Sequence, residues 1–201
     1  MGSAGAGAGA GGDRNGELVT VKGLALDRYM GRWYEIAKIP TRFQPKAGIN
    51  TRATYTLKPD GSVDVLNETW VNGKLNHISG VAWKVDPKSE DAKFLVRFWV
   101  PPFLPVFPVT GDYWVMAIGD DYEWALVGQP SRSLLWVLGR EPALSDEIYS
   151  RLMELAKEQG YDTSAVEKSK HDEISETAQG EERAPKKDSG FWWLKTLFGK
   201  Y

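Results

Sequence analysis

Short runs of alternating hydrophobic and polar residues fill the middle of the chain, and this two-residue period predicts β-strands. In VDVLNETW, Val63 and Val65 alternate with Asp64, and turn signals such as Asp60-Gly61 and Asn72-Gly73 separate neighbouring runs. Eight runs with hairpin-like turns predict an antiparallel sandwich or an up-and-down β-barrel. The runs are 32–39, 51–57, 63–70, 78–85, 93–100, 112–118, 123–128 and 134–139.

The pattern changes after residue 142, where apolar residues recur with a helical period. Ile148, Leu152 and Leu155 fall on one face, with Ser145 as N-cap and Gly160 as the stop. The sequence predicts one amphipathic helix whose apolar stripe packs on the outside of the β structure.

The two ends of the chain have a different composition. Residues 1–16 are rich in glycine and alanine, and we expect a flexible tail. Residues 164–190 are polar and poor in large apolar side chains, which predicts a disordered linker. Residues 191–201 form an aromatic amphipathic segment, so 17–163 is expected to be the single folded domain.

Composition excludes several kinds of function. The 201 residues contain no cysteine, only two histidines and a net charge of −2. Disulfides and thiolate metal sites are impossible, a nucleic-acid partner is not expected, and the lack of cysteine favours an intracellular protein. No nucleophile-elbow, dinucleotide or phosphate-loop motif occurs. The sequence therefore predicts no cofactor, no metal and no enzyme activity, with Glu35 and Asp64 as the first acids to test if catalysis occurs.

Two apolar segments are unusual for a chain in water. Val100–Gly111 contains four prolines, which argue against a regular strand or helix, yet its other residues are largely apolar. It could cover the barrel mouth as a lid, or insert into a membrane interface or a partner. The C-terminal segment could lie on a membrane surface or dock on its own barrel. The predicted membrane contacts are Phe103, Leu104, Phe107, Phe191, Trp192, Trp193, Leu194 and Phe198.

Three short motifs occur in order: Gly31-Arg32-Trp33, Asp121-Tyr122 between the sixth and seventh runs, and Arg140 after the eighth. With this spacing the chain resembles the lipocalin family from about residue 24 to 161. GRWYEIAKIPTRFQ and LLWVLGREP look like the subgroup of apolipoprotein D and bacterial lipocalins. PPFLPVFPVTGDYWV and WWLKTLFGKY are most similar to the plant temperature-induced lipocalins.

The resemblance implies an all-β fold: an eight-stranded antiparallel up-and-down barrel with one C-terminal helix packed outside. Trp33, Asp121-Tyr122 and Arg140 should then meet at the closed end, with Arg140 stacked on Trp33. The loops around Phe43, Asn72, 103–107 and Ser131 should surround the open end.

Ligand contacts also follow from the resemblance. Tyr55, Asn67, Phe98 and Trp136 match pocket-facing positions of the subgroup, and Phe43 is added at the rim. Tyr55 and Asn67 would orient the ligand. Strand alternation would place Ala53, Val65, Val96 and Leu138 on the same inner face.

The resemblance implies a carrier or scavenger of a small hydrophobic molecule: a fatty acid, lysophospholipid, sterol or oxidised lipid. We expect a monomer or weak oligomer in the cytoplasm, peripherally bound to the cytosolic face of the plasma membrane, with a role in temperature and oxidative stress tolerance. Two alternatives stay open. One is a membrane-stabilising protein with an incidental pocket, and the other is a lipid-modifying enzyme.

Overall fold

The computed structural model describes residues 16–40, 48–100 and 107–172. Phe43, Phe103, Leu104 and the C-terminal segment 191–201 lie outside these ranges. Residues 1–15 of the predicted tail and 173–190 of the predicted linker also lie outside them.

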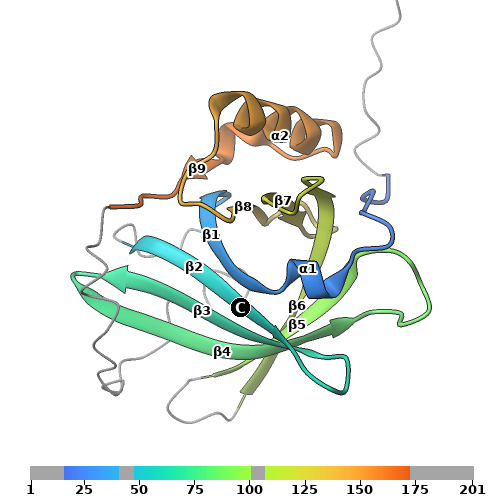
Figure 1. Cartoon of the computed structure of the whole chain (residues 1–201). Coiled ribbons are helices and arrows are strands. Elements are labelled where there is room, and N and C mark those ends of the chain that lie inside the picture. Colours follow the sequence, from blue (N-terminus) through green and yellow to red (C-terminus); the bar gives the residue numbers. More distant parts are fainter. Residues whose placement is uncertain (1–15, 41–47, 101–106, 173–201) are drawn as a thin grey trace, which may run out of the picture.

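Eight antiparallel strands close into a barrel, as the resemblance implied (Figure 1). Each strand pairs with its neighbour in sequence, and β1 pairs with both β8 and β2, which closes the sheet. The strands are β1 Gly31–Lys38, β2 Gly48–Leu57, β3 Val63–Val71, β4 Lys74–Lys84, β5 Lys93–Val100, β6 Phe107–Ile118, β7 Trp124–Gly128 and β8 Leu135–Gly139.

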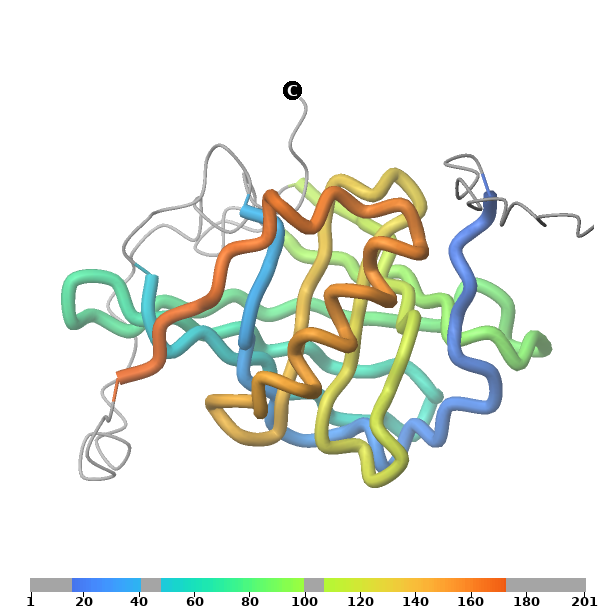
Figure 2. Tube along the Cα trace, turned by 90° about the horizontal axis from the view of Figure 1, so that it is seen from above, coloured from blue at the N-terminus to red at the C-terminus, as the bar shows by residue number. Residues whose placement is uncertain are grey.

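Within the described ranges, two α-helices flank the barrel. The short helix α1, Leu26–Tyr29, precedes β1 at the closed end, and α2, Asp146–Glu158, lies across the outside of the barrel wall (Figures 1 and 2). The Ser145 hydroxyl accepts a hydrogen bond from the Ile148 amide at 3.3 Å, so the predicted N-cap is confirmed. Leu152 and Ala156 of α2 are buried against the strands.

Strand burial follows from which faces are covered. Along β3, buried and more exposed residues alternate because one face points into the barrel and the other faces water. In β7 and β8 every residue is buried, because the outer face is covered as well. The molecule therefore has two apolar compartments: the barrel interior, and an outer layer between the barrel wall and α2.

The first residues of the predicted disordered linker, 164–172, are ordered in the structure. Residues 164–172 contain most of the 3₁₀ turn η1, Thr163–Ala165, and the strand β9, Glu167–Lys168, which pairs with β1. The Ser169 amide donates to the Ile36 carbonyl at 2.9 Å, and the Asn50 amide donates to the Lys170 carbonyl at 2.8 Å. Backbone hydrogen bonds to β1 and β2 hold this segment in place. Amino-acid composition cannot predict such bonds.

The expectation that prolines exclude a regular strand from 100 to 111 is wrong for residues 107–111. Strand β6 starts at Phe107, and Pro108 pairs with Trp99 of β5. Pairing of β6 with β7 begins only at Trp114. Pro108 therefore lies where the strand has a neighbour on one side, and a missing amide donor is tolerated there.

Candidate ligand-binding site

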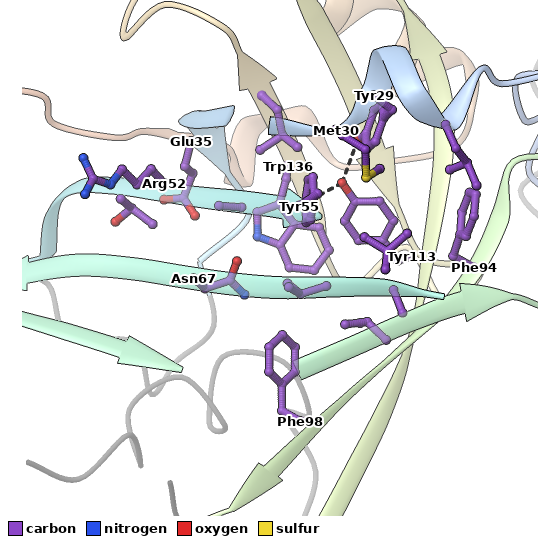
Figure 3. Close-up of a pocket in the computed structure, with 18 of the residues that line it drawn as sticks. Tyr29, Met30, Glu35, Arg52, Tyr55, Asn67, Phe94, Phe98, Tyr113 and Trp136 are labelled. Atoms are coloured by element: carbon purple, nitrogen blue, oxygen red, sulfur yellow. Dashed lines mark hydrogen bonds between the residues drawn. The ribbon is translucent and has the colours of Figure 1, made fainter. Parts of the chain in front are cut away.

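The barrel interior contains a cavity of about 830 Å³, its opening to solvent included (Figure 3). Residues from α1 and from seven of the barrel strands line it. Most of the lining is apolar, and Asn67 and the tyrosine hydroxyls are among its few polar groups. The apolar lining includes Leu26, Met30, Ala53, Val63, Val65, Ala82, Phe94, Val96, Phe98, Trp136 and Leu138.

Four of the five predicted ligand residues reach this cavity. They come from β2, β3, β5 and β8, and the side chains are those of Tyr55, Asn67, Phe98 and Trp136 (Figure 3). Ala53, Val65, Val96 and Leu138 line it too, as strand alternation predicted. The structure thus brings these residues together, while their contact with a ligand stays a prediction.

A glycine makes room for one cavity side chain. The ring of Phe98 lies against Gly80 of β4, its partner in the sheet. A Cβ at Gly80 would come within 2.6 Å of the ring. Any larger residue at position 80 would therefore displace Phe98 from its place on the cavity wall.

The predicted motif residues meet at the closed end. Trp33 is fully buried, and its indole Nε1 donates to the Tyr29 carbonyl at 2.8 Å. The Arg140 guanidinium lies 3.8 Å from the centroid of the Trp33 ring, so the expected stacking is present. Gly31 has a φ of +90°, and a Cβ there would meet Arg140, so glycine suits the position.

Arg140 also links helix α1, the start of strand β1 and the turn between β6 and β7. Its guanidinium donates to the carbonyls of Arg28, Arg32 and Tyr122 at 2.7, 2.8 and 3.2 Å. Asp121, in the same turn as Tyr122, lies 4.0 Å from Arg28. The motif residues thus close the floor below the cavity and do not line it.

Two tyrosines, Tyr29 and Tyr113, are among the cavity residues that sequence reasoning missed. The Tyr113 hydroxyl lies 2.6 Å from that of Tyr29 and 3.0 Å from that of Tyr55. Burial raises the pKa of Tyr55 to about 12 and the pKa values of Tyr29 and Tyr113 well above their ordinary value. Strand parity could have identified Tyr113, which lies two residues from the buried Val115 on β6.

Glu35 lines the cavity where β1 separates from β2, since their pairing ends at Tyr34 and Arg52. Its carboxylate contacts Lys38 and accepts from the Ser169 hydroxyl at 2.6 Å. Asp64, the other acid considered for catalysis, is exposed and pairs with Lys58 at 3.2 Å. Both carboxylates already have partners, as expected for structural groups.

Two aromatic side chains are exposed near the end of the β5–β6 hairpin. Trp99 is 43% exposed and Phe107 is 65% exposed. Phe107 is the one predicted membrane contact within the described residues. Trp99 was not predicted, and it pairs with Pro108, the residue next to Phe107. In the part of the chain that the structure describes, no helix is long and apolar enough to cross a membrane.

Residues 24–171 match the family model described as a lipocalin-like domain, which covers most of the chain and the whole barrel. The chain belongs to the lipocalin family. Lipocalins are generally carriers that bind small hydrophobic ligands, and the cavity described above agrees with such a role.

Relatives within the lipocalin family extend this similarity. Temperature-induced lipocalin-1 of Arabidopsis thaliana is 57% identical over 184 residues, which cover 92% of this chain and 97% of the relative. Mouse apolipoprotein D is 37% identical, covering 68% and 71% of the two chains. The outer membrane lipoprotein Blc of Escherichia coli K12 is 32% identical, covering 73% and 79%.

Solved lipocalin structures share the fold at much lower identity. Insecticyanin from the tobacco hornworm Manduca sexta aligns with a TM-score of 0.63 at 20% identity, over 79% of this chain and 86% of that one. The amine-binding protein of Rhodnius prolixus, solved with tryptamine, aligns with a TM-score of 0.58 at 13% identity, over 82% and 87%. These likenesses support the barrel fold.

Proposed function

We propose that this lipocalin carries or scavenges a lipid-like molecule in its barrel cavity: a fatty acid, a lysophospholipid, a sterol or an oxidised lipid. The main support for this proposal is the apolar cavity. Its few polar groups include Asn67 on the wall and the tyrosine hydroxyls at the closed end. Such a lining favours an elongated apolar molecule with a small polar part.

The driving force for binding would be burial of apolar surface. Each Å² removed from water contributes roughly 25 cal/mol, so a few hundred Å² supply on the order of 5–10 kcal/mol before ordering costs are subtracted. The cavity is closed by Trp33 and Arg140 at one end, so the ligand would enter from the end where β5 and β6 meet in a hairpin.

The proposal includes attachment to the cytosolic face of the plasma membrane and a role in temperature and oxidative stress tolerance. Exposed Trp99 and Phe107 support membrane contact, because aromatic rings favour the membrane interface. The stress role is supported by the similarity to an Arabidopsis protein named temperature-induced lipocalin-1.

Native mass spectrometry of the protein purified from its own source tests the carrier proposal directly. We expect a bound small hydrophobic molecule that is absent from a denatured sample. Lipid titrations followed by tryptophan fluorescence should also saturate, since Trp136 lines the cavity. Absence of a copurified molecule, together with no saturable change for any of the four lipid classes, would contradict the proposal.

The exposed aromatic residues also favour a second candidate, a membrane-stabilising protein with an incidental pocket. Trp99→Ser with Phe107→Ser and the cavity variant Trp136→Ala separate the two functions. If the surface pair abolishes protection of heated vesicles while Trp136→Ala leaves it intact, the second candidate is favoured. The reverse pattern favours the carrier.

A further inference from the structure

Three tyrosine hydroxyls meet at the closed end of the cavity, one each from α1, β2 and β6 (Figure 3). We propose that this tyrosine cluster, Tyr29, Tyr55 and Tyr113, is a polar subsite that binds an uncharged oxygen of the ligand, such as a ketone, aldehyde, ester or alcohol. The inference rests on the proposed carrier function and specifies which end of the ligand reaches the floor.

The tyrosine cluster has one more hydroxyl hydrogen than its internal hydrogen bonds use. Three hydroxyls carry three hydrogens, and Tyr113 shares one contact with Tyr29 and one with Tyr55. Two hydrogens fill these two contacts. The third hydrogen can be donated to another acceptor, and all three side chains line the cavity.

Burial makes an external acceptor favourable for this third hydrogen. Tyr29 and Tyr55 are more than nine-tenths buried, and Met30 and Phe94 are among the apolar side chains around the same end of the cavity (Figure 3). A buried hydroxyl hydrogen without an acceptor is costly. A ligand oxygen placed here would satisfy it, and a ligand hydroxyl could also donate to a tyrosine oxygen.

The surroundings favour a neutral oxygen over a carboxylate. Burial holds the tyrosine pKa values above their ordinary range, so the hydroxyls stay neutral near pH 7. The positive charge of Arg140 stacks on Trp33 and is hydrogen-bonded to three backbone carbonyls. Arg52, a cation in the cavity lining, is paired with Glu68. A carboxylate at the cluster would be attracted to Arg140 only through space, and it would be buried without a directly bonded counter-charge.

A ligand amine fits less well than a neutral oxygen. Arg140 lies below the floor and would repel a cation at the cluster. Two acids border the cavity. The Glu35 carboxylate is already bonded to Lys38 and Ser169. Asp112 directly precedes Tyr113 on β6, so strand alternation points its side chain to the other face of the sheet. The subsite therefore distinguishes ligands of equal apolar length by their polar end.

A matched ten-carbon series tests the subsite: 2-decanone, 1-decanol, decane, decanoate and decylamine, each competing against a fluorescent apolar probe near neutral pH. We expect the ketone and the alcohol to bind about ten-fold more tightly than decane, as for one added hydrogen bond in a buried site. Decanoate and decylamine should bind more weakly than the ketone.

The triple variant Tyr29→Phe, Tyr55→Phe and Tyr113→Phe removes all three hydroxyls and keeps the rings. It should reduce the affinity for 2-decanone to that for decane. Tyr34→Phe, which alters a tyrosine of β1 that does not line the cavity, is the matched control and should preserve the ketone preference. If the triple variant does not fold, Tyr113→Phe alone gives a second comparison: it leaves the hydroxyl hydrogens of Tyr29 and Tyr55 without their shared partner, so the ketone preference should increase.

The possible failures are distinguishable. Equal wild-type affinities for ketone and alkane, tighter binding of decanoate or decylamine, or an equal loss for every ligand in the triple variant would overturn the subsite alone. A wild-type protein that binds none of the five compounds would overturn the carrier proposal and the subsite together.

Discussion

The barrel interior and the outer layer are both apolar and buried, yet they differ in how completely they are filled. Ala82 in the interior keeps 8% exposure because it faces the cavity, whereas Ala156 of α2 is fully buried. The outer layer is packed like an ordinary protein core and holds the wall in place. The interior keeps space for a ligand, so the same residue types serve stability on one side of the wall and binding on the other.

The largest expected effect is in the outer layer. Leu152→Ala removes a fully buried side chain between α2 and the barrel wall, so we expect a loss of about 2–5 kcal/mol in the free energy of unfolding. Denaturant titration measures it, with the half-exposed Leu75→Ala as control. Ligand affinity should not change. A loss in affinity at unchanged stability would show that the two compartments are not separate.

Replacing alanine by phenylalanine on each side of the barrel wall shows which compartment contains free space. Ala156→Phe adds a ring to filled space and should destabilise the protein by about 1–3 kcal/mol. Ala82→Phe adds the ring to the cavity and should change stability by less than about 1 kcal/mol. Thermal unfolding of both variants measures the two effects. Equal destabilisation would show that the cavity has no room for an added ring.

The dependence of stability on alkaline pH tests the burial of Tyr55 in the barrel interior and of Tyr161 in the outer layer. Burial raises the pKa of Tyr55 and of Tyr161 to about 12, against an ordinary value of 10. Between pH 10 and 12 the unfolded chain releases these protons and the folded protein keeps them. Stability is therefore intact below pH 10 and falls as pH rises, by about 2 kcal/mol for each tyrosine by pH 12.

Tyr55→Phe and Tyr161→Phe should each flatten this pH dependence of the free energy of unfolding. Tyr161→Phe should also lower stability at neutral pH, because its hydroxyl donates to the Gln129 carbonyl and accepts from the Gln129 amide, both at 2.8 Å. An unchanged alkaline slope in either variant would contradict the assigned burial of that hydroxyl.

Much of the interior could be predicted by joining the family resemblance to strand alternation. The resemblance supplied Tyr55, Asn67, Phe98 and Trp136, and alternation along the same strands added inward neighbours, all of which line the cavity: Ala53, Val65, Val96 and Leu138. Helix α2 could also be predicted from sequence, because Ser145 caps it and its apolar residues recur with a regular helical period.

Other features depended on contacts that no local pattern encodes. The tyrosine cluster needs α1 to fold across the barrel end, which brings Tyr29 to Tyr113 over 84 residues of sequence separation. The segment around Ser169 is polar and looked disordered, but backbone bonds to β1 and β2 hold it. Pro108 is accommodated because β7 is too short to reach it.

Whether the ligand occupies the barrel cavity can be decided by measuring the affinity of Ala82→Phe for 2-decanone. We expect a folded variant of nearly wild-type stability that has lost at least about ten-fold in affinity, as for a filled site. Leu75→Phe on the exposed surface should bind as the wild type does. Unchanged affinity in a stable Ala82→Phe variant would contradict binding in the cavity and place the ligand elsewhere on the molecule.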